Sequence, residues 1–423
     1  MHRIQEILRA DDVAWMIFMK VYADWEMEKE DYISIIPDEC KWEFWAAQTT
    51  LTGEALVQYV NNVVFPTLKA LPIDETTPPN QLIVKLVFEG INSYQTDGTW
   101  LRQVLNIINE VNFNYTDFEA LLSDLTQTPR VITDFVVDVI KPNLGERVAD
   151  FACGTGGFLA ATLKYLKPQA NLIGDFDLYH KAIYGMENKP LPYMLCIINM
   201  LLHKVENINI FHEDTLEINY TEYNEAEKFD VILINPSSYN CNEIATVQAN
   251  FPQELRSEDV LDLFCNVIMF RLKENGRCAI LLPDSFLCGT DSAKVNIKKK
   301  LVKEFNLHTI VRLSGMATNI LFFDNTAATK HIWFYRADTQ NMNPVLDWIN
   351  NKEEIIIEDI PKAKCYTIEY IEMLNYNLNL CSFNEIHKSI THCKPNKSEL
   401  DMLIDNLYKE IVIIFERTNI LSN

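Results

Sequence analysis

A glycine-rich turn between an apolar strand and a helix is the feature that most limits how this chain can fold. Arg147–Cys153 predicts the strand, and Gly157–Leu166 predicts the helix. Gly154 and Gly156 stand in the turn, where glycines let the backbone adopt angles closed to other residues and approach a ligand closely. This unit predicts an α/β fold with a ligand at the turn. The alternative is a glycine-rich turn that binds nothing.

The spacing of the glycines indicates the kind of ligand. Dinucleotide enzymes use G-x-G-x-x-G to place a pyrophosphate at the start of the helix. Here the glycines stand closer together, at 154, 156 and 157, which favours a cofactor without phosphates. Glu187 ends the predicted second strand, Ala182–Glu187, where an acidic residue suits the hydroxyl groups of a ribose. A solvated glutamate is the alternative interpretation of this residue.

Short apolar runs alternate with helical patterns over the middle of the chain. Phe229–Ile234 is almost wholly apolar, as expected for a strand buried on both faces. Strands that alternate with helices predict an α/β fold with a mostly parallel sheet covered on both sides. Further strands are predicted at Asn207–Glu213, Arg277–Pro283, His308–Leu313, Ile320–Phe323 and His331–Tyr335, and helices at Leu261–Leu272 and Ser292–Glu304.

Changes of pattern divide the chain into three predicted domains. Residues 1–122 predict an N-terminal helical domain, because apolar residues recur at helical spacing in Asp12–Tyr22, Gly53–Val64 and Trp100–Val111. Residues 123–350 hold the alternating strands and helices. Residues 351–423 predict a C-terminal extension that ends in a helix from Lys397 to about Thr418. Aromatic residues expected in the core of the first domain are Tyr22, Trp25, Trp42 and Trp45.

Composition limits the partners and the location of this protein. The 423 residues carry a formal net charge of −22, so the chain is not expected to hold DNA phosphates without a partner. No apolar run is long enough to span a bilayer, and the start shows no signal peptide. The ten cysteines form no Cys-x-x-Cys pair. We therefore expect a cytoplasmic protein with reduced thiols, no metal site and no membrane association.

A basic cluster stands on the predicted helix Ser292–Glu304. A solvated helix face is the usual explanation for such a cluster, and contact with DNA phosphates is the alternative. Its members are Lys294, Lys298, Lys299, Lys300 and Lys303.

A series of segments, taken in order, resembles the modification subunits of type I restriction–modification systems, which are N6-adenine DNA methyltransferases. Asp150–Phe158 is similar to the cofactor loop of that family, and Asp230–Pro236 leads into a segment similar to its catalytic loop. The resemblance covers nearly the whole chain. The other matching segments are Thr128–Arg130, Lys189–Tyr193, Asn199–His203, Asp214–Leu216, Leu281–Asp284 and Asn375–Leu378.

The resemblance implies a fold, a cofactor and the residues that bind it. The fold would be a seven-stranded, Rossmann-like sheet of the S-adenosylmethionine-dependent methyltransferases, between helical ends. Glu187 would hold the ribose of S-adenosylmethionine, and Asp214 would lie near its adenine ring. Contacts with the methionine part would come from Thr128, Pro129 and Arg130. Residues lining the pocket would be Asp150, Gly154, Thr155 and Gly156.

The resemblance also implies an assembly. The substrate would be a specific DNA site, read by a specificity subunit on which the final helix of this chain would pack. A restriction subunit would complete the complex, and two copies of this chain would be present in the modification complex.

Methylation of adenine at its exocyclic nitrogen sets requirements on the catalytic loop. The lone pair is delocalised into the ring, so the enzyme needs acceptors that bind the amino hydrogens and direct the lone pair at the methyl group. Asn235 supplies a side-chain acceptor, and Pro236 can supply its carbonyl. The family has Asn-Pro-Pro followed by Tyr or Phe. This chain has Ser237 and Ser238 instead, with Tyr239 one residue further on.

These departures leave more than one functional hypothesis. Loss of a base–aromatic stack costs roughly 1–3 kcal/mol, and Tyr239 could replace the missing ring. The first hypothesis is an active adenine N6 methyltransferase within a type I complex. The second is a catalytically impaired subunit that acts as a scaffold in that complex. A small-molecule or RNA methyltransferase is the third.

Overall fold

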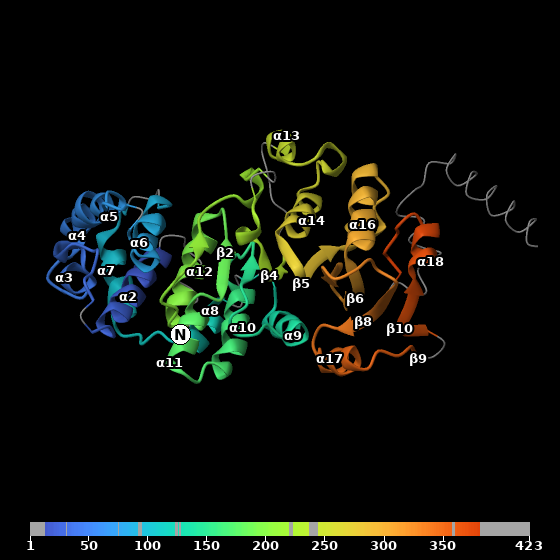
Figure 1. The fold of residues 1–423 in the computed structure, drawn as a ribbon. Helices are drawn as coiled ribbons and strands as arrows, with labels where there is room; N and C mark the ends of the chain where they lie inside the picture. Colours follow the sequence, from blue (N-terminus) through green and yellow to red (C-terminus); the bar gives the residue numbers. More distant parts are fainter. Residues whose placement is uncertain are drawn as a thin grey trace, which may run out of the picture.

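A computed structural model gives the fold of the chain (Figure 1). The helices of the first part lie at one end of the molecule, and a single sheet runs from its middle to the other end. The residues that the structure describes are 13–30, 32–74, 76–91, 95–122, 126, 128–219, 223–236, 244–357 and 360–380.

The first part of the chain packs its helices around aromatic side chains. Trp15 stacks on Trp45 with the ring centroids 6.0 Å apart, and meets Phe65 edge-on at 4.8 Å. The prediction of buried aromatic residues here is confirmed, since Tyr22, Trp25, Trp42 and Trp45 are all buried. The helices are α2 (Ala14–Met27), α3 (Trp42–Trp45), α4 (Gly53–Tyr59), α5 (Phe65–Lys69), α6 (Pro79–Glu89), α7 (Gly98–Asn109) and α8 (Tyr115–Leu122).

Local sequence explains where several of these helices begin. Asp97 caps α7, because its carboxylate accepts hydrogen bonds from the N–H groups of Thr99 and Trp100. Helix α6 begins at Pro79. Proline lacks an N–H, and at this first position an N–H would have no partner within the helix. Helix α2 packs against α12 (Pro190–Leu202), and this contact joins the helical part to the sheet.

The sheet has the strand order β3-β2-β1-β4-β5-β7-β6-β8-β10-β9. Strands β1 to β5 run parallel, and β7 runs antiparallel between β5 and β6. The order reverses at β1, which lies between β2 and β4. The strands are β1 (Val148–Asp150), β2 (Ile183–Met186), β3 (Ile210–Phe211), β4 (Phe229–Ile234), β5 (Leu272–Pro283), β6 (Asn306–Ser314), β7 (Thr318–Asp324), β8 (His331–Asp338), β9 (Ile355–Ile357) and β10 (Ile360–Thr367).

Helices cover both faces of the sheet, as the apolar run of β4 predicts. Ile232 and Ile234 belong to one core with α14 and α16, whereas Val231 and Leu233 belong to another with α9 and α17. Figure 1 shows these two pairs of helices on opposite sides of the sheet. The helices of this part are α9 (Arg130–Ile140), α10 (Gly157–Leu166), α11 (Ile173–His180), α12, α13 (Ile244–Val247), α14 (Val260–Arg271), α15 (Asp284–Cys288), α16 (Ser292–Glu304), α17 (Asn343–Asn350) and α18 (Ile368–Met373).

The expected number of seven strands is wrong, because the sheet has ten. Strand β8 adds to β6 in parallel, β10 pairs with β8, and β9 forms the edge. The sheet therefore runs past the predicted domain boundary at residue 350. The sequence of β10 hides this strand, because Pro361, Lys362 and Lys364 interrupt any apolar run, as is usual near a sheet edge.

Within the ranges given above, no helix has the length and apolar character to cross a membrane, and no group of three or more His, Cys, Asp or Glu side chains could hold a metal ion. The predicted final helix from Lys397 lies outside the described residues.

Candidate functional site

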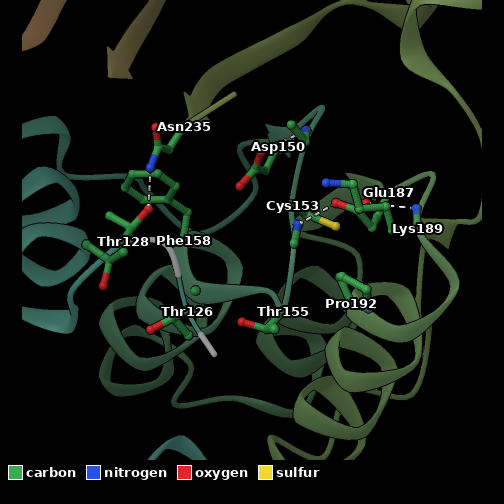
Figure 2. A pocket seen from close by; sticks show the side chains of 14 residues that line it. Thr126, Thr128, Asp150, Cys153, Thr155, Phe158, Glu187, Lys189, Pro192 and Asn235 are labelled. Carbon is green, nitrogen blue, oxygen red and sulfur yellow. Dashed lines mark hydrogen bonds between the residues drawn. The ribbon is translucent and has the colours of Figure 1, made fainter. Parts of the chain in front are cut away.

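A pocket opens at the carboxyl ends of β1, β2 and β4, where the strand order reverses (Figure 2). Ligands of open α/β sheets bind at this kind of position. The space between its walls, including the part that is open to solvent, is about 640 Å³. Its described lining residues are Thr126, Thr128, Thr133, Asp150, Ala152, Cys153, Gly154, Thr155, Gly157, Phe158, Glu187, Lys189, Pro192 and Asn235.

The glycine-rich turn is held in a form that only glycine adopts easily. Gly154 and Gly156 have φ angles of 56° and 84°, in the left-handed region. A Cβ at Gly156 would also lie 2.9 Å from the sulfur of Cys196 on α12, whereas a Cβ at Gly154 would meet nothing within 4 Å. Gly154 lines the pocket, and Gly156 lets the turn pack closely against α12.

Glu187 stands just beyond β2 with both carboxylate oxygens held by backbone N–H groups. Gly154 N donates to Oε2 over 3.0 Å, and Lys189 N donates to Oε1 over 2.8 Å. The turn after β1 therefore fixes the acid after β2. Figure 2 shows both hydrogen bonds.

Asp150, the last residue of β1, is the most deeply buried carboxyl group of the pocket. Burial raises the pKa of Asp150 to about 8, and the nearby charge of Glu187 acts in the same direction. A hydrogen bond from the N–H of Ala152 over 3.0 Å opposes this shift. A cationic group placed in the pocket would favour the ionised form of Asp150.

The polar groups of the pocket suit a cation that carries hydroxyl groups. Two carboxyl groups and four threonine side chains face the space, and Lys189 is the one basic residue among the described lining. Carboxyl groups in the same space disfavour a phosphate, which carries negative charge. The lining thus fits the prediction of a cofactor without phosphates.

Asn235 meets the pocket at the end of β4. Its Nδ2 donates to Oγ1 of Thr128 over 2.8 Å, and Pro236 is buried next to it. Phe158, in the first turn of α10, lines the same space as an aromatic ring. The rest of the predicted catalytic loop, including Tyr239, lies outside the described residues.

Several predicted cofactor residues do not line the pocket. Pro129 and Arg130 are exposed, although they follow Thr128 directly. Arg130 pairs instead with Glu119 on α8 at 2.5 Å and with Asp134 on α9 at 3.6 Å. Asp214 accepts a hydrogen bond from the N–H of Leu216 and begins a short 3-10 helix, Thr215–Glu217. Gly156, although it is part of the turn, packs against Cys196 on α12 and is not among the described lining residues.

Other lining residues were not singled out from the sequence. Thr126, Thr133, Phe158, Lys189 and Pro192 all face the space. Phe158, Lys189 and Pro192 belong to segments that the resemblance had matched, so those segments were the available signal for them. Thr133 carried no signal, since one threonine within a helix does not reveal the direction of its side chain.

The basic cluster on α16 is largely engaged within the molecule. Lys294 Nζ binds Asp259 at 2.8 Å and Asp262 at 3.0 Å, and Lys298 Nζ donates to the carbonyls of Leu287 and Gly289. Lys300 pairs with Glu304, and Lys303 with Glu372. Lys299 is exposed. These contacts favour a structural role for most of the cluster.

Comparison with known proteins identifies the family. The model of the N-6 DNA Methylase family matches residues 126–389, which include every lining residue of the pocket. The chain belongs to this family. Among curated relatives of this N-6 DNA methylase, the type I restriction enzyme EcoEI methylase subunit of Escherichia coli is 38% identical over 376 residues, which cover 78% of this chain and 76% of that subunit.

Solved structures agree with the family. A modification subunit of a putative type I restriction enzyme from Vibrio vulnificus has a TM-score of 0.73 at 29% identity, over 86% of this N-6 DNA methylase and 88% of that chain. A chain from a study of the assembly of the type I R-M system has a TM-score of 0.73 at 26% identity, over 98% of this chain and 93% of that one.

Proposed function

We propose that this chain transfers a methyl group from S-adenosylmethionine to N6 of adenine in DNA, as the modification subunit of a type I restriction–modification complex. One observation carries the proposal: Asn235, at the end of β4, faces the same pocket as the two carboxyl groups of Asp150 and Glu187. An acceptor for an amino group thus lies beside a site suited to a cationic nucleoside. Relatives named methylase subunits of type I enzymes support the same conclusion.

The pocket residues fit S-adenosylmethionine by their chemistry. Glu187, fixed by two backbone N–H groups, would accept hydrogen bonds from the ribose hydroxyls. Asp150, whose carboxyl group is kept partly neutral by burial, would pair with the positive charge of the methionine part. The glycines at the turn let the backbone lie close to the ligand. When bound, the cofactor supplies an electrophilic methyl group.

Asn235 and Pro236 would position the adenine amino group. Asn235 Oδ1 accepts one N–H of that group and the Pro236 carbonyl accepts the other, so the nitrogen lone pair turns out of the ring plane. Held in this way, the lone pair would point at the electrophilic methyl group that the bound cofactor would supply. The surplus proton on nitrogen leaves to water after transfer. Catalysis by these residues is therefore positioning, without a general base.

The DNA site, the specificity subunit, the restriction subunit and a second copy of this chain complete the proposal. The net charge of −22 supports a need for partners, because acidic residues outnumber basic ones and repel DNA phosphates. The modification complex would then obtain its DNA affinity from the specificity subunit and its chemistry from this one.

Methyl transfer by the reconstituted complex tests the proposal. The chain and its specificity subunit are incubated with unmethylated, amplified host DNA and cofactor labelled in the methyl group. We expect label in the DNA as N6-methyladenine after digestion to nucleosides. Asn235→Ala should lower the rate by about 100-fold or more. Cofactor binding and complex formation without any label would instead favour the scaffold hypothesis.

A further inference from the structure

A single hydrogen bond joins two segments that reach the pocket from different parts of the chain. Thr128 precedes α9, and Asn235 follows β4, 107 positions later. Asn235 Nδ2 donates to Thr128 Oγ1 over 2.8 Å. Figure 2 shows the two side chains pointing toward one another, with the amide oxygen of Asn235 on the side away from Thr128.

The direction of the Asn235 amide decides what it can bind. A side-chain amide has a donor end and an acceptor end, which differ little in shape. With its nitrogen held by Thr128, Asn235 presents Oδ1 as the end for a substrate. The amino group of adenine needs an acceptor there, because it offers N–H donors while its lone pair forms the new bond. A reversed amide would place N–H groups against N–H groups.

On the basis of the proposed function, we infer that Thr128 is a positioning residue, which fixes the Asn235 amide with its oxygen toward the target amino group. Thr128 acts through Asn235 and need not touch the base. This role is separate from the cofactor contact that the family resemblance implies for Thr128. A hydroxyl group has lone pairs to accept from Asn235 and one proton to donate into the pocket, so one side chain can serve both roles.

The chemistry of the side chain provides a matched pair of variants. Valine has the shape of threonine but cannot accept a hydrogen bond, so Thr128→Val frees the amide to rotate. Thr128→Ser keeps the hydroxyl group and should keep the amide fixed. Thr326→Val makes the same change at an exposed threonine just after β7. This residue lies at the opposite end of the strands from the pocket. It reports any general effect of losing a hydroxyl group.

The first readout is rate, measured in the complex with the specificity subunit at saturating cofactor. Saturation removes any change in cofactor affinity from the comparison. We expect Thr128→Val to lower kcat by about tenfold or more, the rate equivalent of one lost hydrogen bond, with a smaller change in KM for DNA. Thr128→Ser should recover most of the rate, and Thr326→Val should match the wild type. Equal rates for Thr128→Val and the wild type would overturn the inference.

The second readout needs no methyl transfer. In protein labelled with ¹⁵N in asparagine, Asn235→Asp identifies the side-chain amide signal of Asn235. We expect its two protons to exchange slowly and separately in the wild type and in Thr128→Ser, and faster in Thr128→Val. An unchanged signal in Thr128→Val overturns the inference even if that variant is inactive for another reason, such as partial unfolding.

The two proposals can fail separately. If the wild type transfers no methyl group, the proposed function is wrong. If Asn235→Ala abolishes transfer and Thr128→Val does not, only the role of Thr128 fails.

Discussion

At the scale of single residues, burial sets the chemistry of the pocket. Asp150 is 2% exposed, and its one described hydrogen bond comes from the N–H of Ala152. Glu187 is also buried, but its two carboxylate oxygens accept hydrogen bonds from two backbone N–H groups. The two acids therefore contribute differently. Both oxygens of Glu187 have hydrogen-bond donors before any ligand binds, whereas the ionised form of Asp150 is stabilised only when a cation enters the pocket.

Replacing Asp150 should stabilise the protein and weaken cofactor binding. The pKa of Asp150 in the fold is about 8, above 3.8 for a free aspartate. Between these values the unfolded chain ionises and the native state does not, so native stability falls as pH rises from about 4 to 8. Asp150→Asn avoids this loss. Its melting temperature should exceed that of the wild type by a few degrees at pH 8 and by little at pH 4 to 5.

Asp177→Asn, on the exposed surface of α11, removes the same charge without burial and is the control. Calorimetric unfolding across this pH range provides the measurement. A melting difference that stays constant from pH 5 to pH 8 would contradict the assigned cause. Titration with S-adenosylmethionine should show at least about tenfold weaker binding for Asp150→Asn, as expected for a lost charged contact.

Glu187→Gln should weaken cofactor binding and also loosen the turn. Glutamine offers one acceptor oxygen and an NH₂ group, so it can satisfy only one of the N–H groups of Gly154 and Lys189. We expect a stability loss of about 1–3 kcal/mol in denaturant unfolding. Glu213→Gln, at an exposed position beyond β3, should leave both properties unchanged. Full cofactor affinity in Glu187→Gln would refute the ribose role of this residue.

At the scale of elements, the turn between β1 and α10 depends on two glycines for two different reasons. Gly154→Ala should lower the free energy of unfolding only by the strain of a left-handed backbone, about 1–2 kcal/mol. Gly156→Ala adds a clash with the sulfur of Cys196, so its loss of stability should be larger. Gly174→Ala, in α11 with nothing within 4 Å, should instead gain about 0.5–1 kcal/mol. Denaturant unfolding of the three variants checks this order, and equal losses at Gly154 and Gly156 would contradict the close packing on α12.

At the scale of the whole molecule, charge separates chemistry from DNA binding. The chain has 59 acidic and 37 basic residues, so its net charge repels DNA, and four of the five lysines on α16 are engaged within the molecule. We expect the isolated chain to bind duplex DNA more weakly than about 100 µM at 0.15 M salt. The complex with the specificity subunit should bind far more tightly. Gel-shift titration measures both DNA affinities. Micromolar binding by the isolated chain would refute the claim that the specificity subunit supplies the DNA affinity.

The sequence by itself determined the local units of this protein. The strand, glycine turn and helix at 147–166, the almost wholly apolar strand β4, and the placement of Glu187 and Asn235 at strand ends could all be predicted. Each depends on properties that act over a few residues: the φ angles open to glycine, and the apolar pattern of a strand buried on both faces.

Only the tertiary structure decided what lies beside what. It extends the sheet beyond residue 350 with β9 and β10, and turns Arg130 away from the pocket toward Glu119. It also joins Thr128 to Asn235 across 107 positions of the chain. Such contacts depend on how whole layers pack and on which charged partner lies within reach. These contacts therefore cannot be predicted from single segments of the sequence.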